Sequence, residues 1–133
     1  VKQSNSNMGE LVELVRLAGG KMAVTTGIDS QFYPALSIGA VGIFSTAASV
    51  IPRQMSTIYE LFQKGQRDEA LALHMKVQVL NRFLEYDPGY VAPAKEALTM
   101  MGLPAGPVRR PQPDLTEEER RGVRDALVQL GLI

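Results

Sequence analysis

Apolar and polar positions alternate along the first fifty residues with two different periods. Residues 8–18 place apolar side chains at helical spacing, which predicts an amphipathic helix with Asn7 as its N-cap. Short β-favouring runs over 21–26 and 41–45 flank a second short helical segment over 30–36. Because strands and helices alternate at short spacing, this part of the chain predicts βαβ units with a parallel sheet.

The pattern changes after Pro52 and becomes helical. Apolar positions recur at helical spacing over 53–64, 68–86 and 91–101, and glycines or the Asp87-Pro88-Gly89 turn follow these segments. Three successive helices are therefore expected.

The last thirty residues predict a connector and a final helix. Residues 102–113 hold four prolines and two glycines, which favours an extended segment. Thr116, with Glu119 three residues further on, forms a capping-box pattern. A last helix is expected to run from there to about residue 130.

The predicted sheet is too small to stand alone. The sequence offers two good strands, and residues 1–2 could be the stub of a third. Buried parallel strands need helices on both faces or closure into a barrel. We therefore expect this chain to be a fragment of a larger barrel or one partner of a split barrel.

Composition and charge exclude several function classes. The 133 residues include 45% hydrophobic side chains, and 14 Lys and Arg balance 14 Asp and Glu. A net charge of zero gives no excess positive charge that would attract nucleic acid or an anionic membrane. No apolar run approaches the ~20 residues that a membrane helix needs. The absence of cysteine excludes disulfides, thiolate zinc sites and cysteine nucleophiles, and we expect a cytoplasmic protein.

An ordered set of short motifs carries a family resemblance. These motifs are Lys2-Gln-Ser-Asn-Ser-Asn, Thr26-Gly-Ile-Asp29, Gly39-Ala-Val-Gly-Ile-Phe-Ser45, Ala48-Ser-Val-Ile-Pro52, Ala94-Lys-Glu-Ala-Leu98 and Gly102-Leu-Pro-Ala-Gly-Pro-Val-Arg-Arg-Pro111. Their order resembles the C-terminal part of the dihydrodipicolinate synthase / N-acetylneuraminate lyase family of class I aldolases, which are (β/α)8 TIM barrels with a helical C-terminal extension. The resemblance implies an α/β fold in which residues 1–52 form the last βα units, about strands 6–8. Residues 53–133 would form the final barrel helix and the helical extension.

The resemblance also implies roles for five residues. Lys2 matches the lysine on the sixth barrel strand that forms a Schiff base with pyruvate or another 2-keto acid. Gly27 and Asp29 match the loop after the seventh strand, which borders the substrate, although both also suit a simple turn. Phe44 and Ser45 lie on the eighth strand, where a main-chain carbonyl lines the active site.

The chemistry of a class I aldolase explains why such a lysine would be used. An apolar barrel interior favours the neutral, nucleophilic amine, and the protonated imine then serves as an electron sink for carbon–carbon bond formation or cleavage. We therefore expect neither a metal nor a cofactor. Gln3, followed by Ser4, departs from the commonest synthase pattern, so the member of the family and its substrate stay open.

The resemblance implies partners as well as a substrate. The family's Gly-x-x-Gly-Glu segment, its Thr-Thr pair and its proton-relay Tyr belong to the first five strands, which these 133 residues do not contain. We therefore expect the chain to need the remaining N-terminal barrel segment for activity, and to assemble as a homodimer or homotetramer.

A non-catalytic alternative remains open at this point. Residues 52–133 could be a helical interaction or oligomerisation module, with methionines forming an adaptable surface. Core positions are the favoured interpretation of these methionines. His74 is expected to be a structural or surface histidine, Lys95 to be structural, and Arg109 and Arg110 to pin the connector. The methionines in question are Met55, Met75, Met100 and Met101.

Overall fold

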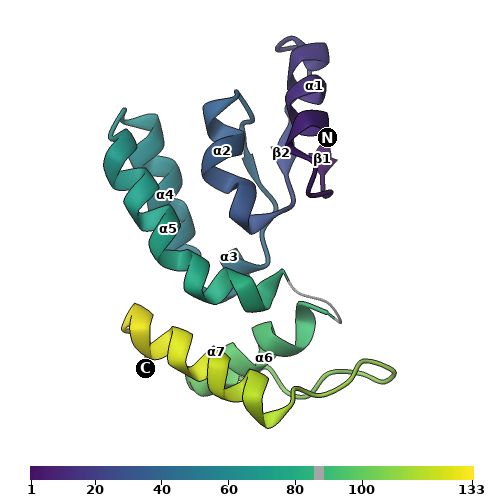
Figure 1. Cartoon of the computed structure of the whole chain (residues 1–133), viewed down its shortest axis with the longest axis vertical. Helices are drawn as coiled ribbons and strands as arrows, with labels where there is room; N and C mark the ends of the chain where they lie inside the picture. The colour runs from purple at the N-terminus through teal and green to yellow at the C-terminus, as the bar shows by residue number, and fades with distance from the viewer. Residues whose placement is uncertain (86–88) are drawn as a thin grey trace.

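The computed structural model describes residues 1–85 and 89–133 and contains a small parallel sheet at one end (Figure 1). Three two-residue strands, β1 (Lys2–Gln3), β2 (Thr25–Thr26) and β3 (Gly42–Ile43), lie side by side in the order β1-β2-β3. Both pairs are parallel. The predicted parallel sheet is confirmed, but β2 and β3 are shorter than the predicted runs over 21–26 and 41–45.

Two connections join the strands and cover one face of the sheet. Helix α1 (Met8–Ala18) follows β1, and its N-cap Asn7 accepts hydrogen bonds from two backbone N–H groups of the first turn. The 3₁₀ turn η1 (Asp29–Gln31) and helix α2 (Phe32–Ser37) follow β2. The helix predicted over 30–36 is thus split in two. A small hydrophobic core lies between these helices and the sheet, formed by Leu11, Val24, Ala35 and Ala40.

A helical hairpin packs beside α2 and η1. The short α3 (Ala47–Val50) leads into α4 (Pro52–Gln63), which pairs with the long α5 (Arg67–Leu84) (Figure 1). Helix α3 was not predicted. The helix predicted over 68–86 ends at Leu84, with Glu85 as its C-cap. Residue 86 and residues 87–88 of the predicted turn lie outside the described residues.

The C-terminal part contains two further helices and the predicted connector. Helix α6 (Val91–Met100) and helix α7 (Glu117–Leu130) pack on each other and on α5. The capping box of Thr116 and Glu119 is confirmed, because both of its reciprocal hydrogen bonds are present. Residues 102–113 contain no helix or strand, as expected.

Both Lys95 and Arg110 make contacts that hold the connector. The Nζ of Lys95 donates to the carbonyl oxygens of Ala105 and Pro107, each at 2.9 Å. Arg110 pairs with the exposed Asp114, which directly follows the connector, at 3.3 Å, a carboxylate contact of the expected kind. Lys95 reaches the connector from α6, and its single ammonium can bond two carbonyls of this extended segment.

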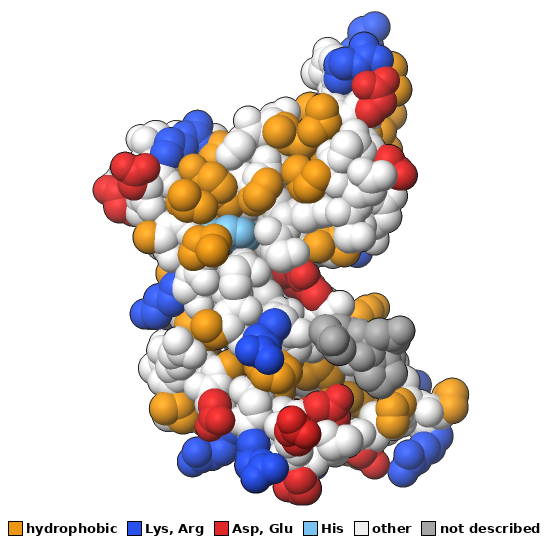
Figure 2. All heavy atoms as spheres, in the orientation of Figure 1, with side chains coloured by type: hydrophobic (Ala, Val, Ile, Leu, Met, Phe, Trp, Pro, Cys, Tyr) orange, Lys and Arg blue, Asp and Glu red, His pale blue; other side chains and the backbone are white. Residues whose placement is uncertain are grey.

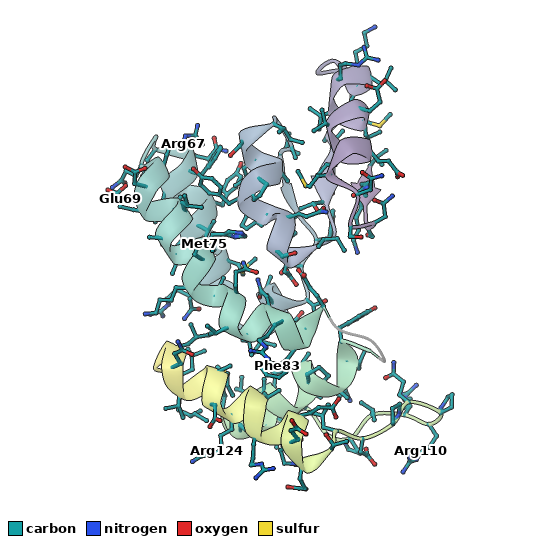
Figure 3. All side chains as sticks on the ribbon, in the orientation of Figure 1. Arg67, Glu69, Met75, Phe83, Arg110 and Arg124 are labelled. Atoms are coloured by element: carbon teal, nitrogen blue, oxygen red, sulfur yellow. The ribbon has the colours of Figure 1, made fainter. Side chains whose placement is uncertain are left out.

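Helix α5 joins the sheet end of the molecule to the C-terminal helices. Phe83 projects from α5 towards α7 (Figure 3), where a Cβ built on Gly122 would lie 2.6 Å from its ring. The absence of a side chain at Gly122 therefore lets α7 approach α5 closely. A large continuous core runs from α2 through the α4–α5 hairpin to α7.

The methionines occupy different environments. Met55 is buried in the core, while Met100 and Met101 are half-buried against it, in line with the favoured interpretation. Met75 is 61% exposed, so its predicted core position is wrong. It follows the buried His74 by one residue, and one helical step of about 100° turns it outward. None of the helices in the described ranges has the length and apolarity to cross a membrane.

Candidate active site

Lys2 lies on the face of the sheet that the described part of the chain leaves open. Side chains along a strand point to opposite faces in turn, and neighbours in register share a face. The register places Lys2 beside Thr25 and Thr25 beside Gly42, so these three side-chain positions share one face of the sheet. The next residue on each strand, such as Thr26, points to the opposite face. Thr26 is fully buried beneath the helices, whereas Lys2 is exposed.

Gly27 lies directly under the Lys2 side chain. A Cβ built on Gly27 would stand 2.5 Å from Cε of Lys2 and would also collide with Oγ of Ser4. The N–H of Gly27 donates to the carbonyl of Gln3 at 2.7 Å, which fixes the two segments together. The structure therefore brings two of the predicted residues, Lys2 and Gly27, into contact.

Ser4 is a member of this site that the sequence analysis did not select. It follows Lys2 by two residues, and that spacing places both side chains on the same face of an extended segment. The alternation of side chains between the two faces of the strand could therefore have identified Ser4 from the sequence.

Asp29 and Ser45 form a second pair, and it is buried. The Asp29 carboxylate accepts hydrogen bonds from the Ser45 hydroxyl and, at 3.1 Å, from the N–H of Ala47. Burial raises the pKa of Asp29, while these two donors oppose the rise by stabilising the anion. With 2% of its surface exposed, Asp29 ties the loop after β2 to the start of α3. Substrate contact by Asp29 or Ser45 stays a prediction.

Phe44 stands on the same open face as Lys2. It follows Gly42 by two residues, its side chain is 65% exposed, and its N–H donates to the carbonyl of Thr26 at 3.0 Å. This hydrogen bond continues the pairing of β3 with β2 by one residue. The predicted role of the Phe44 carbonyl at the substrate stays a prediction.

The loop between Gly27 and α2 is held by contacts from its own strand and from α5. The Thr26 hydroxyl accepts the N–H of Ile28 at 3.1 Å, which forms a tight turn after β2. The N–H of Ser30 donates to the carboxylate of Glu85, and Nε2 of His74 lies 3.2 Å from the Ser30 carbonyl. His74 is buried and structural, one of the two interpretations that its sequence context allowed. Glu85 gave no signal in the sequence, because it lies 55 residues from Ser30.

The residues of this chain do not by themselves enclose Lys2. Its side chain is exposed, so the dry barrel interior expected around the amine is absent from the described ranges. A cavity of about 710 Å³ lies elsewhere, between α5, α6, the connector and α7. Its described lining includes Phe83, Pro93 and Leu115 and none of the five predicted site residues.

Sequence comparisons match nearly the whole chain to one protein family. The family model described as the Dihydrodipicolinate synthetase family matches residues 1–130. A 4-hydroxy-tetrahydrodipicolinate synthase of Halalkalibacterium halodurans is 35% identical over 127 residues, which are 96% of this chain and 43% of that protein.

Solved structures give the same result. The chloride-inhibited dihydrodipicolinate synthase from Acinetobacter baumannii, complexed with pyruvate, is 30% identical with a TM-score of 0.88, covering 99% of this chain and 45% of that one. The enzyme from Cyanidioschyzon merolae with lysine bound is 29% identical with a TM-score of 0.91, covering 99% and 44%. The chain spans less than half the length of these relatives.

Proposed function

Because this chain belongs to the dihydrodipicolinate synthetase family, we propose that Lys2 forms a Schiff base with pyruvate or a related 2-keto acid in a lyase or aldolase reaction. The observation that carries the proposal is the position of Lys2. Its side chain stands on the open sheet face and over Gly27, which directly follows the carboxyl end of β2. Active sites of (β/α)8 barrels lie at the carboxyl ends of their strands. The relative complexed with pyruvate supports the substrate class.

The proposed chemistry uses the Lys2 amine as a nucleophile. The neutral amine adds to the ketone carbonyl of the 2-keto acid, and loss of water gives the protonated imine. The imine accepts the electron pair released when a proton leaves the adjacent carbon, which produces an enamine able to attack an acceptor carbonyl. Gly27 leaves room for the lysine side chain, and the open sheet face leaves room for the substrate.

The active form is proposed to be a complete (β/α)8 barrel. The outer edges of β1 and β3 carry no partner strand in the described ranges, and the relatives are more than twice as long as this chain. A remaining N-terminal barrel segment would pair with both edges, enclose Lys2 and supply the other substrate contacts. We further propose a cytoplasmic homodimer or homotetramer, in line with the family resemblance.

The open edges lead to a prediction for the isolated chain. Unpaired strand edges and exposed apolar side chains favour association. We expect residues 1–133 alone to aggregate or to form a loosely packed state without a sharp thermal transition, as followed by near-UV circular dichroism. A cooperative melt of a soluble monomer would contradict this expectation.

Borohydride trapping tests the Schiff base directly. The complete barrel is incubated with pyruvate and sodium borohydride, and peptide mass spectrometry then locates the reduced adduct. We expect the adduct on Lys2 and none in the Lys2→Arg variant, because a guanidinium does not form the imine. Lys21→Arg, which alters an exposed lysine between α1 and β2, is the matched control and should trap normally. An intact, folded barrel without a Lys2 adduct would refute the proposal.

A further inference from the structure

Helix α5 holds the Gly27 loop from outside the sheet. The N–H of Ser30 donates to the carboxylate of Glu85, the C-cap residue of α5. The carbonyl oxygen of Ser30 lies 3.2 Å from Nε2 of His74, which is also on α5. Both backbone polar groups of one residue, three positions after Gly27, are therefore bonded to side chains of a single helix.

Glu85 supplies a cap that the loop itself lacks. The first N–H groups of a helical turn have no partner within the turn. Ile28 occupies the N-cap position of η1 and has no side-chain acceptor, and no side-chain cap bond is present there. The Glu85 carboxylate takes this role from another helix, and a hydrogen bond to an ionised acceptor is stronger than one between neutral groups.

His74 meets Ser30 in a fixed orientation. A carbonyl oxygen only accepts hydrogen bonds, so Nε2 carries the proton in this contact. The imidazole packs beside the Tyr33 ring at 6.0 Å between centroids, and Gln78 follows it one helical turn later and donates to the His74 carbonyl at 2.9 Å. Burial lowers the pKa of His74 and favours the neutral ring. Figure 2 shows this histidine among hydrophobic side chains over α2 and α5.

The other contacts of the loop fix different atoms. The Thr26 hydroxyl holds the N–H of Ile28, and Asp29 bonds Ser45 and the N–H of Ala47. Only the two α5 side chains reach the backbone of the following residue, Ser30, in the described structure. Removing either one leaves Ser30 with one backbone polar group free to move into water.

We propose that Glu85 and His74 are positioning residues that keep Gly27 against the Lys2 side chain by holding the Ser30 backbone. The inference rests on the proposed function of Lys2 and adds to it a means by which α5, which contributes no predicted contact to the substrate, controls the site. Glu85 and His74 together are called the α5 clamp below.

Glu85→Ala in the complete barrel is the primary test, because Glu85 is exposed and its loss leaves the core intact. We expect the Ser30 amide to exchange hydrogen about tenfold faster, as measured by NMR. At a fixed pyruvate concentration the rate of borohydride trapping on Lys2 should fall about tenfold, while the final amount trapped stays the same. Glu85→Gln keeps an acceptor oxygen and should restore most of both values.

Two further variants complete the design. His74→Phe keeps an aromatic ring but removes the N–H that bonds the Ser30 carbonyl. This variant should also lower the rate of trapping on Lys2. Glu60→Ala, which removes an exposed glutamate from α4, is the control and should match the wild type. A purely structural role of Glu85 would lower the amount of adduct rather than its rate of formation.

The outcomes separate the inference from the function on which it rests. Normal trapping rates in Glu85→Ala, with a wild-type adduct on Lys2, would overturn the α5 clamp and leave the proposed function standing. Unchanged Ser30 exchange in Glu85→Ala would overturn the clamp as well. A wild-type barrel that forms no adduct would overturn the proposed function, and the clamp with it.

Discussion

Replacing Gly27 with alanine is expected to abolish most imine formation on Lys2 while the protein stays folded. The new methyl group would lie 2.5 Å from Cε of Lys2, well inside van der Waals contact, and would also overlap Oγ of Ser4. Both atoms belong to side chains that can rotate away, so the fold can absorb the change. The lysine amine, however, must leave its position, and a displacement of about 1 Å at a reacting group can cost about a hundredfold in rate.

Gly42→Ala is the matched control for this experiment. Gly42 lies on β3, on the same face as Lys2, and nothing stands within 4 Å of a Cβ built there. The rate of borohydride trapping on Lys2 should therefore be unchanged in Gly42→Ala and lower by on the order of a hundredfold in Gly27→Ala. Equal trapping rates in the two variants would show that the contact between Gly27 and Lys2 does not control the position of the reacting amine.

The second large effect is expected for Asp29→Ala. This change removes the acceptor of the Ser45 hydroxyl and of the Ala47 N–H, and the latter lies in a buried position. Unsatisfied buried donors are costly, so the free energy of unfolding should fall by roughly 2–4 kcal/mol in urea denaturation of the complete barrel. Asp125→Ala, an exposed aspartate on α7, should change it by less than about 0.5 kcal/mol. A loss for Asp29→Ala no larger than that of the control would contradict the structural role of this carboxylate.

Asp29→Asn removes the titratable charge and, because an amide has a single oxygen, keeps only one of the two acceptors. Burial raises the pKa of Asp29 above its ordinary value of 3.8, so the folded protein binds this proton more tightly than the unfolded chain does. The contribution of Asp29 to the free energy of unfolding should therefore decrease as the pH rises from about 3.8 through the raised pKa. Because asparagine does not titrate, the variant should lack this decrease when the two proteins are compared across the acidic range. Parallel pH profiles would contradict the raised pKa.

Elements with local signals could be predicted from the sequence. Helix α1 begins at the expected Asn7 cap, and Gly19 ends it in a left-handed conformation with φ of 51°. Helix α7 begins at the expected capping box. In each case the residues that satisfy the free backbone groups lie within one turn of the helix end, so the sequence contains the whole interaction.

Elements that depend on distant partners could not be predicted in the same way. The N-cap Thr46 of helix α3 makes no side-chain cap bond. Ser45 accepts the second N–H of the helix locally, but the carboxylate that bonds the first N–H comes from Asp29, 18 residues earlier. The split between η1 and α2 likewise accompanies a bond from Ser30 to Glu85. Met75 and His74 have adjacent positions in the same apolar pattern, and only the packing of α5 against α2 and η1 decides which of the two is buried.

The sequence alone determined that the chain alternates short parallel strands with helices, continues as a helical extension, and resembles a family of class I aldolases. These properties follow from periodicity, caps and ordered motifs, which are read along the chain. The role of Lys2 as the nucleophile stays a prediction. Only the tertiary structure placed Gly27 under Lys2, buried Asp29 against Ser45 and brought α5 to Ser30. Those contacts join segments up to 55 residues apart, and hydrogen bonds and steric fit at such separations depend on how the helices pack.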